Sequence, residues 1–502
     1  MGGKKILTYS HFVRTKVTIA LLAFAIILSF STYLYSQDNF NDPVSFQSLK
    51  DILELSDQKI HNTLQEISYN SSLHPAHTDP ETGLWDKKAM GREQWTSGFF
   101  AGQLWYMYKL TGDVYWKELA FEWTNDLKKM SEVATDHDIG FRIFNSYGNG
   151  FKLTGKLEYY QTILQAAAAL SKRFDPDIGA IKSWEWIGNY PVIIDNLLNL
   201  ELLFWAAENG GRKEWYDMAL THAQTSLKHH MRPDGTSYHI VDFDNQGNVN
   251  WKDTRQGYGP NSVWARGQAW AIYGFTMIYR FTQKNEFLEA AENAANYFIE
   301  NLPDDYVPIY DFKEPITSVQ SKDASAAAIA ASGFLELYEF TGNPTYFDSA
   351  ADILRSLTSE NYTSYHDETS SILMKSTLHR GADNKGTSYA DYYLLEALDR
   401  HYSLTHGQLN QLEFQSFLHL RQNFPNPFNN QTRIYYSIET ESNVQLLIYD
   451  SAGRKVKTLV DQFLPAGNYS VTLDASDLSS GLYFYSLKSG RDIITRKLTL
   501  IK

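Results

Sequence analysis

The sequence predicts a mainly α protein, an (α/α)6 barrel followed by a small all-β sandwich. The main observation is a pattern that recurs between residues 50 and 400, in which an apolar helix end, a short polar or glycine turn and an aromatic helix start follow one another. A helix pair of this kind cannot bury its apolar face alone and must stack on the next pair. The clearest copies are residues 104–120, 203–219, 277–291 and 337–351.

An open α-solenoid is the alternative arrangement of the same helix pairs, and it would expose a long concave protein-binding surface. The two arrangements differ in where they place the polar residues that interrupt the apolar pattern. Here those residues gather in the connections and at the helix starts, as expected for loops that carry function. We therefore expect a closed ring of paired helices.

The chain changes character near residue 415. Short alternating runs such as 433–438, 444–449 and 469–473 are separated by glycine and asparagine turns, which is typical of a small β-sandwich. The sequence thus predicts a signal peptide (1–36), a barrel domain (37–405), a linker (406–418) and a C-terminal β-domain (419–502).

The composition limits the class of ligand. The net charge of −13, without any stretch dense in lysine and arginine, argues against a nucleic-acid partner. Aromatic residues make up 15% of the 502 residues. Core packing explains most of them, and an aromatic-lined cleft for sugar rings or other flat ligands is the functional alternative. An anionic ligand would need a few well-placed cations, because the overall field repels it.

The N-terminus has the features of an export signal. Lys4, Lys5, Arg14 and Lys16 precede the apolar stretch 17–36, which reads as a signal peptide cleaved before Gln37 or as a signal anchor. The chain contains no cysteine. We expect an exported protein that is stabilised by its core without disulfide bonds.

Asp195 is the residue that fits its surroundings least. It lies in the apolar run 187–209, where burial would raise the pKa of its carboxyl group. A buried hydrogen-bond donor that simply holds the carboxylate is one interpretation. The other is an acid that stays protonated at neutral pH and is ready to donate. The spacing alone favours neither interpretation.

Three further residues come from the connections that precede helices. Asp138 lies in the loop 136–141, where two acids flank a histidine; no third ligand is evident, so we expect no metal site. Asp138 is either a helix cap or one half of a carboxyl pair with Asp195. His239 follows a turn, and Trp95 opens an aromatic helix; each is a candidate ligand contact or an ordinary packed side chain.

A polar, glycine-rich loop then leads into a helix that carries Arg266 and Trp270. These two residues are four positions apart and share a helix face. An arginine beside tryptophans suits a ring that bears a carboxylate, since the guanidinium pairs with the charge and an indole covers the ring. A structural ion pair is the alternative role for Arg266.

Six short motifs occur in one order: WTSGFFAGQLW, HDIGF, IIDNLLNL, the turn 254–257, SVWARGQAWAIYGF and SYADYYLLEAL. Together, over about residues 50–402, they resemble the unsaturated glucuronyl hydrolases of glycoside hydrolase family 88. The resemblance implies an (α/α)6-barrel glycoside hydrolase domain without cofactor or metal. It implies that Asp195 is the general acid/base and Asp138 the second essential carboxylate. It places substrate contacts at Trp95, His239, Thr254, Gln256, Trp264, Arg266 and Trp270.

The same resemblance implies the reaction. Such enzymes act on oligosaccharides that a polysaccharide lyase has left with a 4,5-unsaturated uronic acid at the non-reducing end, and they hydrate the vinyl ether. An unsaturated rhamnogalacturonyl hydrolase and a non-catalytic glycan-binding surface protein are the alternatives. The resemblance leaves the parent polysaccharide open among ulvan, glycosaminoglycan, gellan and xanthan, and the C-terminal region favours ulvan.

Residues 419–502 resemble the C-terminal sorting domain of the type IX secretion system. The resemblance rests on FPNPFNNQTRIYYSI, LLIYDSAGRKVKTL and LPAGNYSVTLDASDLSSGLYFYSL in that order. It implies export across the outer membrane by that machinery, a secreted or cell-surface location, and removal of the tail. A carbohydrate-binding module is the competing interpretation of a terminal β-sandwich.

Overall fold

The computed structural model describes residues 46–315, 320–365, 369–407, 419–438, 440–490 and 492–502. The predicted signal peptide and nearly all of the predicted linker lie outside these ranges. Within them, no helix is both long and apolar enough to cross a bilayer. The described residues form a helical region up to residue 407 and a β-region from residue 419.

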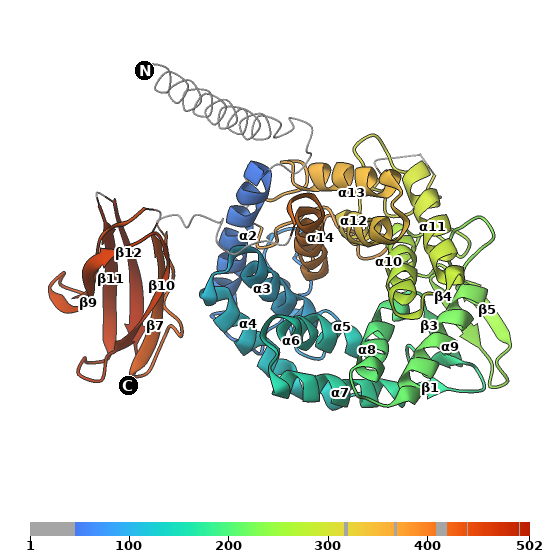
Figure 1. The fold of residues 1–502 in the computed structure, drawn as a ribbon, viewed down its shortest axis with the longest axis horizontal. Helices are drawn as coiled ribbons and strands as arrows, with labels where there is room; N and C mark the ends of the chain where they lie inside the picture. The colour runs from blue at the N-terminus through green and yellow to red at the C-terminus, as the bar shows by residue number, and fades with distance from the viewer. Residues whose placement is uncertain (1–45, 316–319, 366–368, 408–418, 439, 491) are drawn as a thin grey trace, which may run out of the picture. The chain divides into compact units, whose positions relative to one another are not determined.

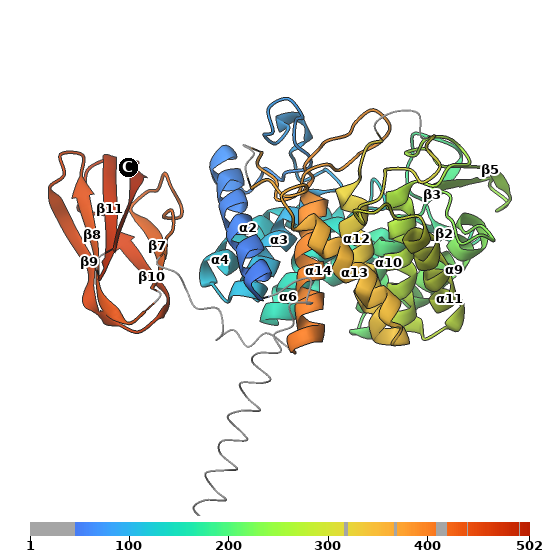
Figure 2. The ribbon, with the colours of Figure 1, turned by 90° about the horizontal axis from the view of Figure 1, so that it is seen from above.

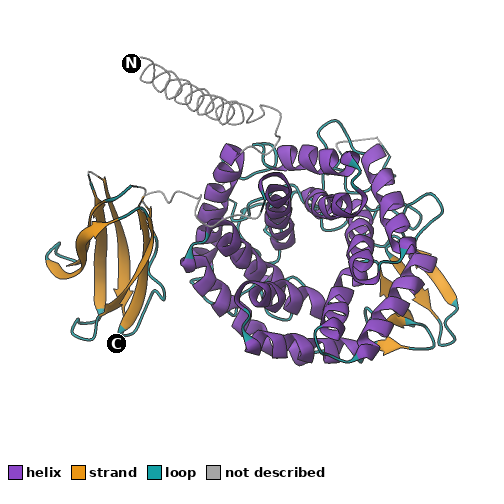
Figure 3. Ribbon diagram, in the orientation of Figure 1, coloured by secondary structure: helices purple, strands orange, loops and turns teal. Residues whose placement is uncertain are grey.

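The helical region is a double ring of helices (Figures 1 and 3). The inner ring closes, because contacts run from each inner helix to the next and from the last back to the first. The predicted (α/α)6 barrel is therefore confirmed, and the open solenoid is excluded. The inner helices are α3 (Ser97–Thr111), α5 (Ile139–Ile143) with η3 (Phe144–Gly148) and α6 (Asn149–Thr154), α8 (Asn196–Glu208), α10 (Ala265–Thr282), α12 (Ala324–Thr341) and α14 (Ser388–His406).

The outer ring packs around these helices; α2 precedes them in the chain, and each other outer helix follows an inner one. Its members are α2 (Phe46–Glu66), α4 (Val114–Asp126), α7 (Leu157–Ser171), α9 (Lys213–His230), α11 (Asn285–Glu300) and α13 (Pro344–Leu357). The short helices η1 (Lys87–Ala89) and η2 (Leu127–Glu132) lie in connections. Most outer helices have one apolar face, whereas α8 and α12 are apolar nearly all round, as expected for helices enclosed on every side.

The recurring turn of the sequence has a simple stereochemical basis. After α12, Gly342 adopts a left-handed conformation (φ +65°) that ends the helix, and Asn343 then accepts a hydrogen bond from the Thr345 amide to start α13. Gly112 and Asp113 play the same two roles between α3 and α4. A glycine followed by a capping residue thus reverses the chain within two residues.

Short strands and long loops lie at one end of the barrel (Figure 2). The strands β3 (Tyr190–Ile193), β4 (Ile240–Phe243) and β5 (Val249–Asp253) form an antiparallel sheet, and β1 (Phe174–Asp175) pairs with β2 (Ala180–Ile181). The sheet connects the starts of α8 and α10, because β3 leads into α8 and β5 precedes α10. It therefore fixes the loops at the helix N-termini.

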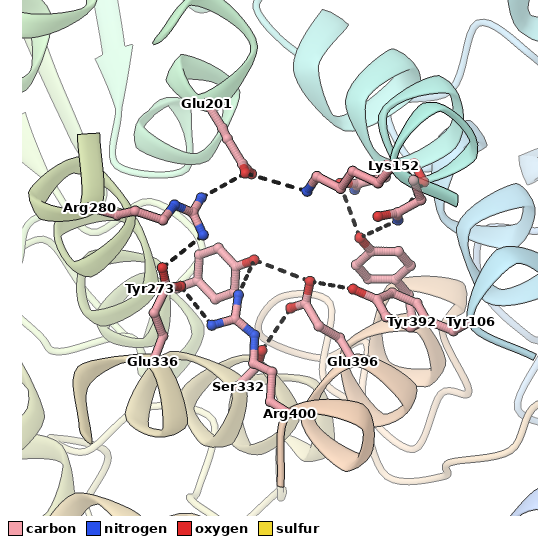
Figure 4. A network of polar contacts seen from close by, with 12 residues as sticks. Tyr106, Lys152, Glu201, Tyr273, Arg280, Ser332, Glu336, Tyr392, Glu396 and Arg400 are labelled. Atoms are coloured by element: carbon pink, nitrogen blue, oxygen red, sulfur yellow. Dashed lines mark hydrogen bonds and ion pairs between the residues drawn. The ribbon is translucent and has the colours of Figure 1, made fainter. Parts of the chain in front are cut away.

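A polar network lies at the opposite end of the barrel, and Figure 4 shows its side chains from close by. Glu336 is 2.8 Å from Arg280 and 2.7 Å from Arg400, and Arg280 is also 2.7 Å from Glu201. Partial negative charge accumulates where the C-terminal ends of parallel helices converge. Basic side chains in the last turns of α3, α6 and α10 offset it.

Hydroxyl groups complete this network. Glu396 accepts hydrogen bonds from Tyr106 (2.9 Å), Tyr273 (3.3 Å) and Ser332 (2.7 Å). A cavity of about 340 Å³ lies among these side chains. The charged side chains that line this cavity are already paired with one another, so we interpret the network as structural: it stabilises this end of the barrel.

The β-region consists of two antiparallel sheets around one apolar core. One sheet has the order β10-β7-β6 and the other β12-β11-β8-β9. This confirms the predicted all-β sandwich. The strands are β6 (His419–Leu420), β7 (Gln431–Ile438), β8 (Ser442–Asp450), β9 (Lys455–Leu464), β10 (Gly467–Asp474), β11 (Gly481–Ser489) and β12 (Asp492–Leu500).

Candidate active site

Asp195 lies between the end of β3 and the first residue of α8. The preceding residue, Ile194, donates its amide to the carbonyl oxygen of His239 (2.9 Å), which brings Asp195 and His239 together. The Asp195 side chain occupies the N-cap position without capping the helix, and its Oδ1 is buried without a hydrogen-bond partner among the described residues. Burial raises the pKa of Asp195 to about 7.

Asp138 immediately precedes α5 and is 9% exposed. Burial raises its pKa well above the usual range; the carboxylates of Asp136 and Asp195 raise it further, while Arg142 opposes the shift. The carboxyl groups of Asp138 and Asp195 therefore act on each other electrostatically. Ionisation of either buried carboxyl group therefore disfavours ionisation of the other.

Asn199, one turn into α8, holds the two acidic segments together. Its Oδ1 accepts a hydrogen bond from the Phe141 amide of α5 (2.8 Å). Gly140 makes this approach feasible, because a Cβ atom there would lie 2.6 Å from Asn199 Oδ1. The glycine in the HDIGF motif is thus required by close packing of α5 on α8.

Two buried histidines accompany the acids. His239 Nε2 lies 3.7 Å from Asp195 Oδ1, and His137 Nε2 lies 3.5 Å from Asp138 Oδ1. Burial lowers the pKa of His137 to about 3 and that of His239 well below its usual value, so both rings are neutral. All four ring nitrogens are buried without hydrogen-bond partners among the described residues. Such groups require an explanation, and contact with a bound ligand supplies one.

Arg266 is held firmly by its neighbours. Its guanidinium donates to Asp323 Oδ2 (2.9 Å) and to the carbonyl oxygens of Thr377 (2.6 Å) and Leu378 (2.8 Å). The guanidinium also lies 4.5 Å from the Trp264 ring centre. The structural ion pair considered for Arg266 is therefore present. These bonds come from Nη1 and Nη2, and the Nε–H of the guanidinium is not among their donors.

The predicted tryptophans contact residues of the segments that carry the acids or lie next to them. The Trp264 and His239 ring centres are 4.8 Å apart. Trp270 is fully buried and contacts Phe141, which also contacts the partly exposed Trp95 (ring centres 5.5 and 5.6 Å). The indole nitrogens of Trp264 and Trp270 are buried without partners among the described residues.

Thr254 and Gln256, the two predicted polar contacts in the loop before α10, both donate hydrogen bonds to backbone carbonyl oxygens. Thr254 is buried and donates its hydroxyl to the Ser262 carbonyl oxygen (3.2 Å), so its side chain serves the loop itself. Gln256 donates to the carbonyl oxygen of Leu378 (3.3 Å), which also accepts from Arg266. Gln256 therefore borders the site, and Thr254 supports the loop behind it.

The structure adds residues that the sequence did not single out. Asp323 caps α12 and holds Arg266, and its position just before an alanine-rich helix was the available signal. Tyr389 lies 5.4 Å from the Arg266 guanidinium. Trp184 contacts both His137 and His239. The sequence signal that could have indicated Trp184 is the pair of tryptophans in the run 182–189.

The closed double ring, the buried acid pair and the surrounding indoles define the class of protein: an (α/α)6-barrel glycosidase. Residues 69–323 match the family model described as Glycosyl Hydrolase Family 88. The chain therefore belongs to that family. Residues 422–502 match the model of the secretion system C-terminal sorting domain, which confirms the predicted type IX sorting module and excludes a carbohydrate-binding module there.

Individual relatives agree with this assignment. The chain is 42% identical over 323 residues to an unsaturated glucuronyl hydrolase of Formosa agariphila, covering 62% of this chain and 81% of the relative. It is 33% identical to an unsaturated chondroitin disaccharide hydrolase of Streptococcus pyogenes serotype M1, covering 71% and 92%. A solved unsaturated glucuronyl hydrolase specific for heparin superposes with a TM-score of 0.67 at 36% identity, covering 71% of this chain and 98% of that chain.

Proposed function

We propose that the protein removes a 4,5-unsaturated glucuronyl residue from the non-reducing end of oligosaccharides that a polysaccharide lyase has produced. The observation that carries the proposal is the buried Asp195 carboxyl group, which acts electrostatically on Asp138, has a pKa of about 7 and has an oxygen without a hydrogen-bond partner among the described residues. An acid of this kind is protonated in a large fraction of molecules at neutral pH. The names of the relatives support the same substrate class.

The proposed chemistry is hydration of the vinyl ether. Protonated Asp195 donates to C4 of the double bond, and positive charge develops at C5 and the ring oxygen. The Asp195 carboxylate then accepts a proton from the water that adds to C5. The resulting hemiketal opens, and the remaining oligosaccharide leaves. Asp138 would position this water, and neutral His239 would hydrogen-bond the sugar.

Electrostatics support an anionic sugar in spite of the net charge of −13. The N-termini of α3, α8, α10, α12 and α14 carry the candidate residues, so their partial positive charges converge at this end of the barrel. Arg266 lies at the same end, where its charge is paired with Asp323. A uronate carboxylate next to Arg266 and covered by Trp264 suits both features.

Loss of the ultraviolet absorbance of the unsaturated uronate tests the proposal. Asp195→Asn should abolish the loss of absorbance. Asp391→Asn is the matched control, because Asp391 is also a buried carboxyl group with a pKa of about 7, but its oxygens accept the Ile372 and Leu373 amides (3.0 and 2.8 Å). Its variant should keep most of the activity per folded molecule. Substantial activity in Asp195→Asn would refute the assignment.

The parent polysaccharide is part of the proposal. The exported character implied by the sorting domain suits a polymer outside the cell, and ulvan is our first candidate. Products of ulvan, glycosaminoglycan, gellan, xanthan and rhamnogalacturonan lyases, tested side by side, would identify the substrate. Fastest turnover of rhamnogalacturonan products would favour the alternative, an unsaturated rhamnogalacturonyl hydrolase.

The processing of the chain is also proposed. We infer removal of residues 1–36 and of the sorting domain, with the barrel domain ending near residue 405. Mass spectrometry of the exported protein would measure both ends. A mature protein that retains residues 419–502 would contradict removal of the tail.

A further inference from the structure

An exposed indole lies near the candidate active site. Trp186 is 62% exposed, whereas most tryptophans of the barrel are buried. A single exposed aromatic side chain is common on protein surfaces. Trp186 differs because the surrounding structure fixes it and because its neighbours lead into the site.

The loop that carries Trp186 is fixed on both sides. Before it, the Glu185 carboxylate pairs with Arg173 (2.8 Å) and Lys182 (2.7 Å). After it, Asp242 accepts the backbone amides of Asn189 and Tyr190, both at 2.8 Å. The exposed ring is therefore presented by an ordered loop, and binding to it would require little further ordering.

A series of contacting rings leads from Trp186 toward the acids. Trp186 stacks on Trp184, with ring centres 4.9 Å apart and 26° between the planes. Trp184 in turn meets the buried His239 edge-on, with ring centres 6.0 Å apart. Exposure increases along this series from His239 to Trp186. An oligosaccharide that extends outward from the site would therefore pass along these rings.

Arg255 supplies a cation at Trp186, the outer end of this series of rings. Its guanidinium lies 4.9 Å from the Trp186 ring centre, and its side chain is exposed. No carboxylate among the described residues pairs with it, and Glu185, next to Trp186 in the chain, is paired with Arg173 and Lys182. Its charge also contributes to the lowered pKa of His239, so its field reaches the site.

We propose that Trp186 and Arg255 form an outer subsite that binds an anionic sugar of the leaving oligosaccharide, beyond the sugar bonded to the unsaturated uronate. The inference rests on the proposed function. Trp184 and Arg255 both pack on the Trp186 ring, so a sugar ring packs against the part of the indole that stays exposed, and the guanidinium pairs with a sulfate or carboxylate on that sugar. Elsewhere the acidic surface repels such a group, so this pair selects longer, charged substrates.

Binding and turnover together test the subsite. Binding is measured by calorimetry on the full chain carrying Asp195→Asn, with an unsaturated disaccharide and an unsaturated tetrasaccharide. The tetrasaccharide is used sulfated, desulfated, and with a carboxylate in place of the sulfate. Adding Trp186→Ala should weaken binding of the sulfated tetrasaccharide about tenfold and leave disaccharide binding within about twofold.

Three further variants separate the contributions. Arg255→Gln should remove the preference for the charged tetrasaccharides; comparing sulfate with carboxylate shows which group Arg255 binds. Trp186→Phe should restore most of the affinity, because a ring remains. Arg212→Gln, which removes an exposed arginine from the turn before α9, is the control and should change nothing.

The outcomes are distinguishable from failure of the proposed function. Equal effects of Trp186→Ala on disaccharide and tetrasaccharide, or none on either, would overturn the subsite. If the unaltered chain leaves the absorbance of every lyase product intact while tetrasaccharide binding still depends on Trp186 and Arg255, the subsite stands and the proposed reaction fails. In the active chain, Trp186→Ala should raise KM for the tetrasaccharide and leave kcat unchanged.

Discussion

Replacing Asp195 with asparagine should make stability depend less on pH while it removes activity. The pKa of Asp195 rises from 3.8 to about 7 in the folded protein. A change of one in pKa corresponds to about 1.4 kcal/mol, so the ionised carboxylate destabilises the folded state by up to about 4 kcal/mol. Asparagine carries no charge and avoids this penalty.

The sign follows from linkage. The folded state binds the Asp195 proton more tightly than the unfolded state, so the stabilisation from this proton is complete below about pH 4, the pKa in the unfolded chain. It is lost as pH rises toward 7 and stays lost above that. The unfolding free energy of Asp195→Asn minus that of the unaltered protein should therefore increase by up to about 4 kcal/mol between pH 4 and pH 8.

Urea unfolding followed by tryptophan fluorescence measures this difference. All 12 tryptophans lie between residues 85 and 270, so the signal reports the barrel alone and not the β-region. Any fixed cost of burying the new amide is the same at every pH and cancels from the trend. A difference that does not change with pH would refute the raised pKa and, with it, the reasoning about the acid.

Three other predictions follow from the site and the barrel. kcat/KM should fall about tenfold for each pH unit above about 7, because the reaction needs protonated Asp195; a flat profile to pH 9 would contradict this. Arg266→Lys should lower kcat/KM at least tenfold, because an ammonium cannot bond Asp323 and two carbonyl oxygens in the same geometry; steady-state kinetics would show it. Glu336→Gln should lower the unfolding free energy by about 3 kcal/mol in urea titrations, because Arg280 and Arg400 lose their shared charged partner. KM should stay unchanged, and a changed KM would argue against a structural network.

Much of the fold was predictable because its signals are local. The glycine and capping residue at 342–343 end one helix and start the next, and both are visible in the sequence. The contacts that close the ring depend on helices far apart in the chain, so the recurring turn could only suggest closure. The alternating runs after residue 419 likewise predicted strands but not their order in two sheets.

The site was predictable in part for a similar reason. Asp195 stood out because a carboxylate interrupts an apolar run. Asp323 and Tyr389 could not be found in this way, since they matter only through Arg266, which lies more than 50 residues before either of them. The sequence also left the role of Arg266 open, and the structure shows that a partner acid already holds it.

The central claim is that Asp195 delivers a proton to C4 of the unsaturated uronate. The most direct measurement is the reaction in deuterated water, with the released sugar followed by NMR at early times. The account predicts one deuterium at C4 together with loss of the double bond, and neither change with Asp195→Asn. Release of a sugar that retains its double bond and carries no deuterium at C4 would contradict it.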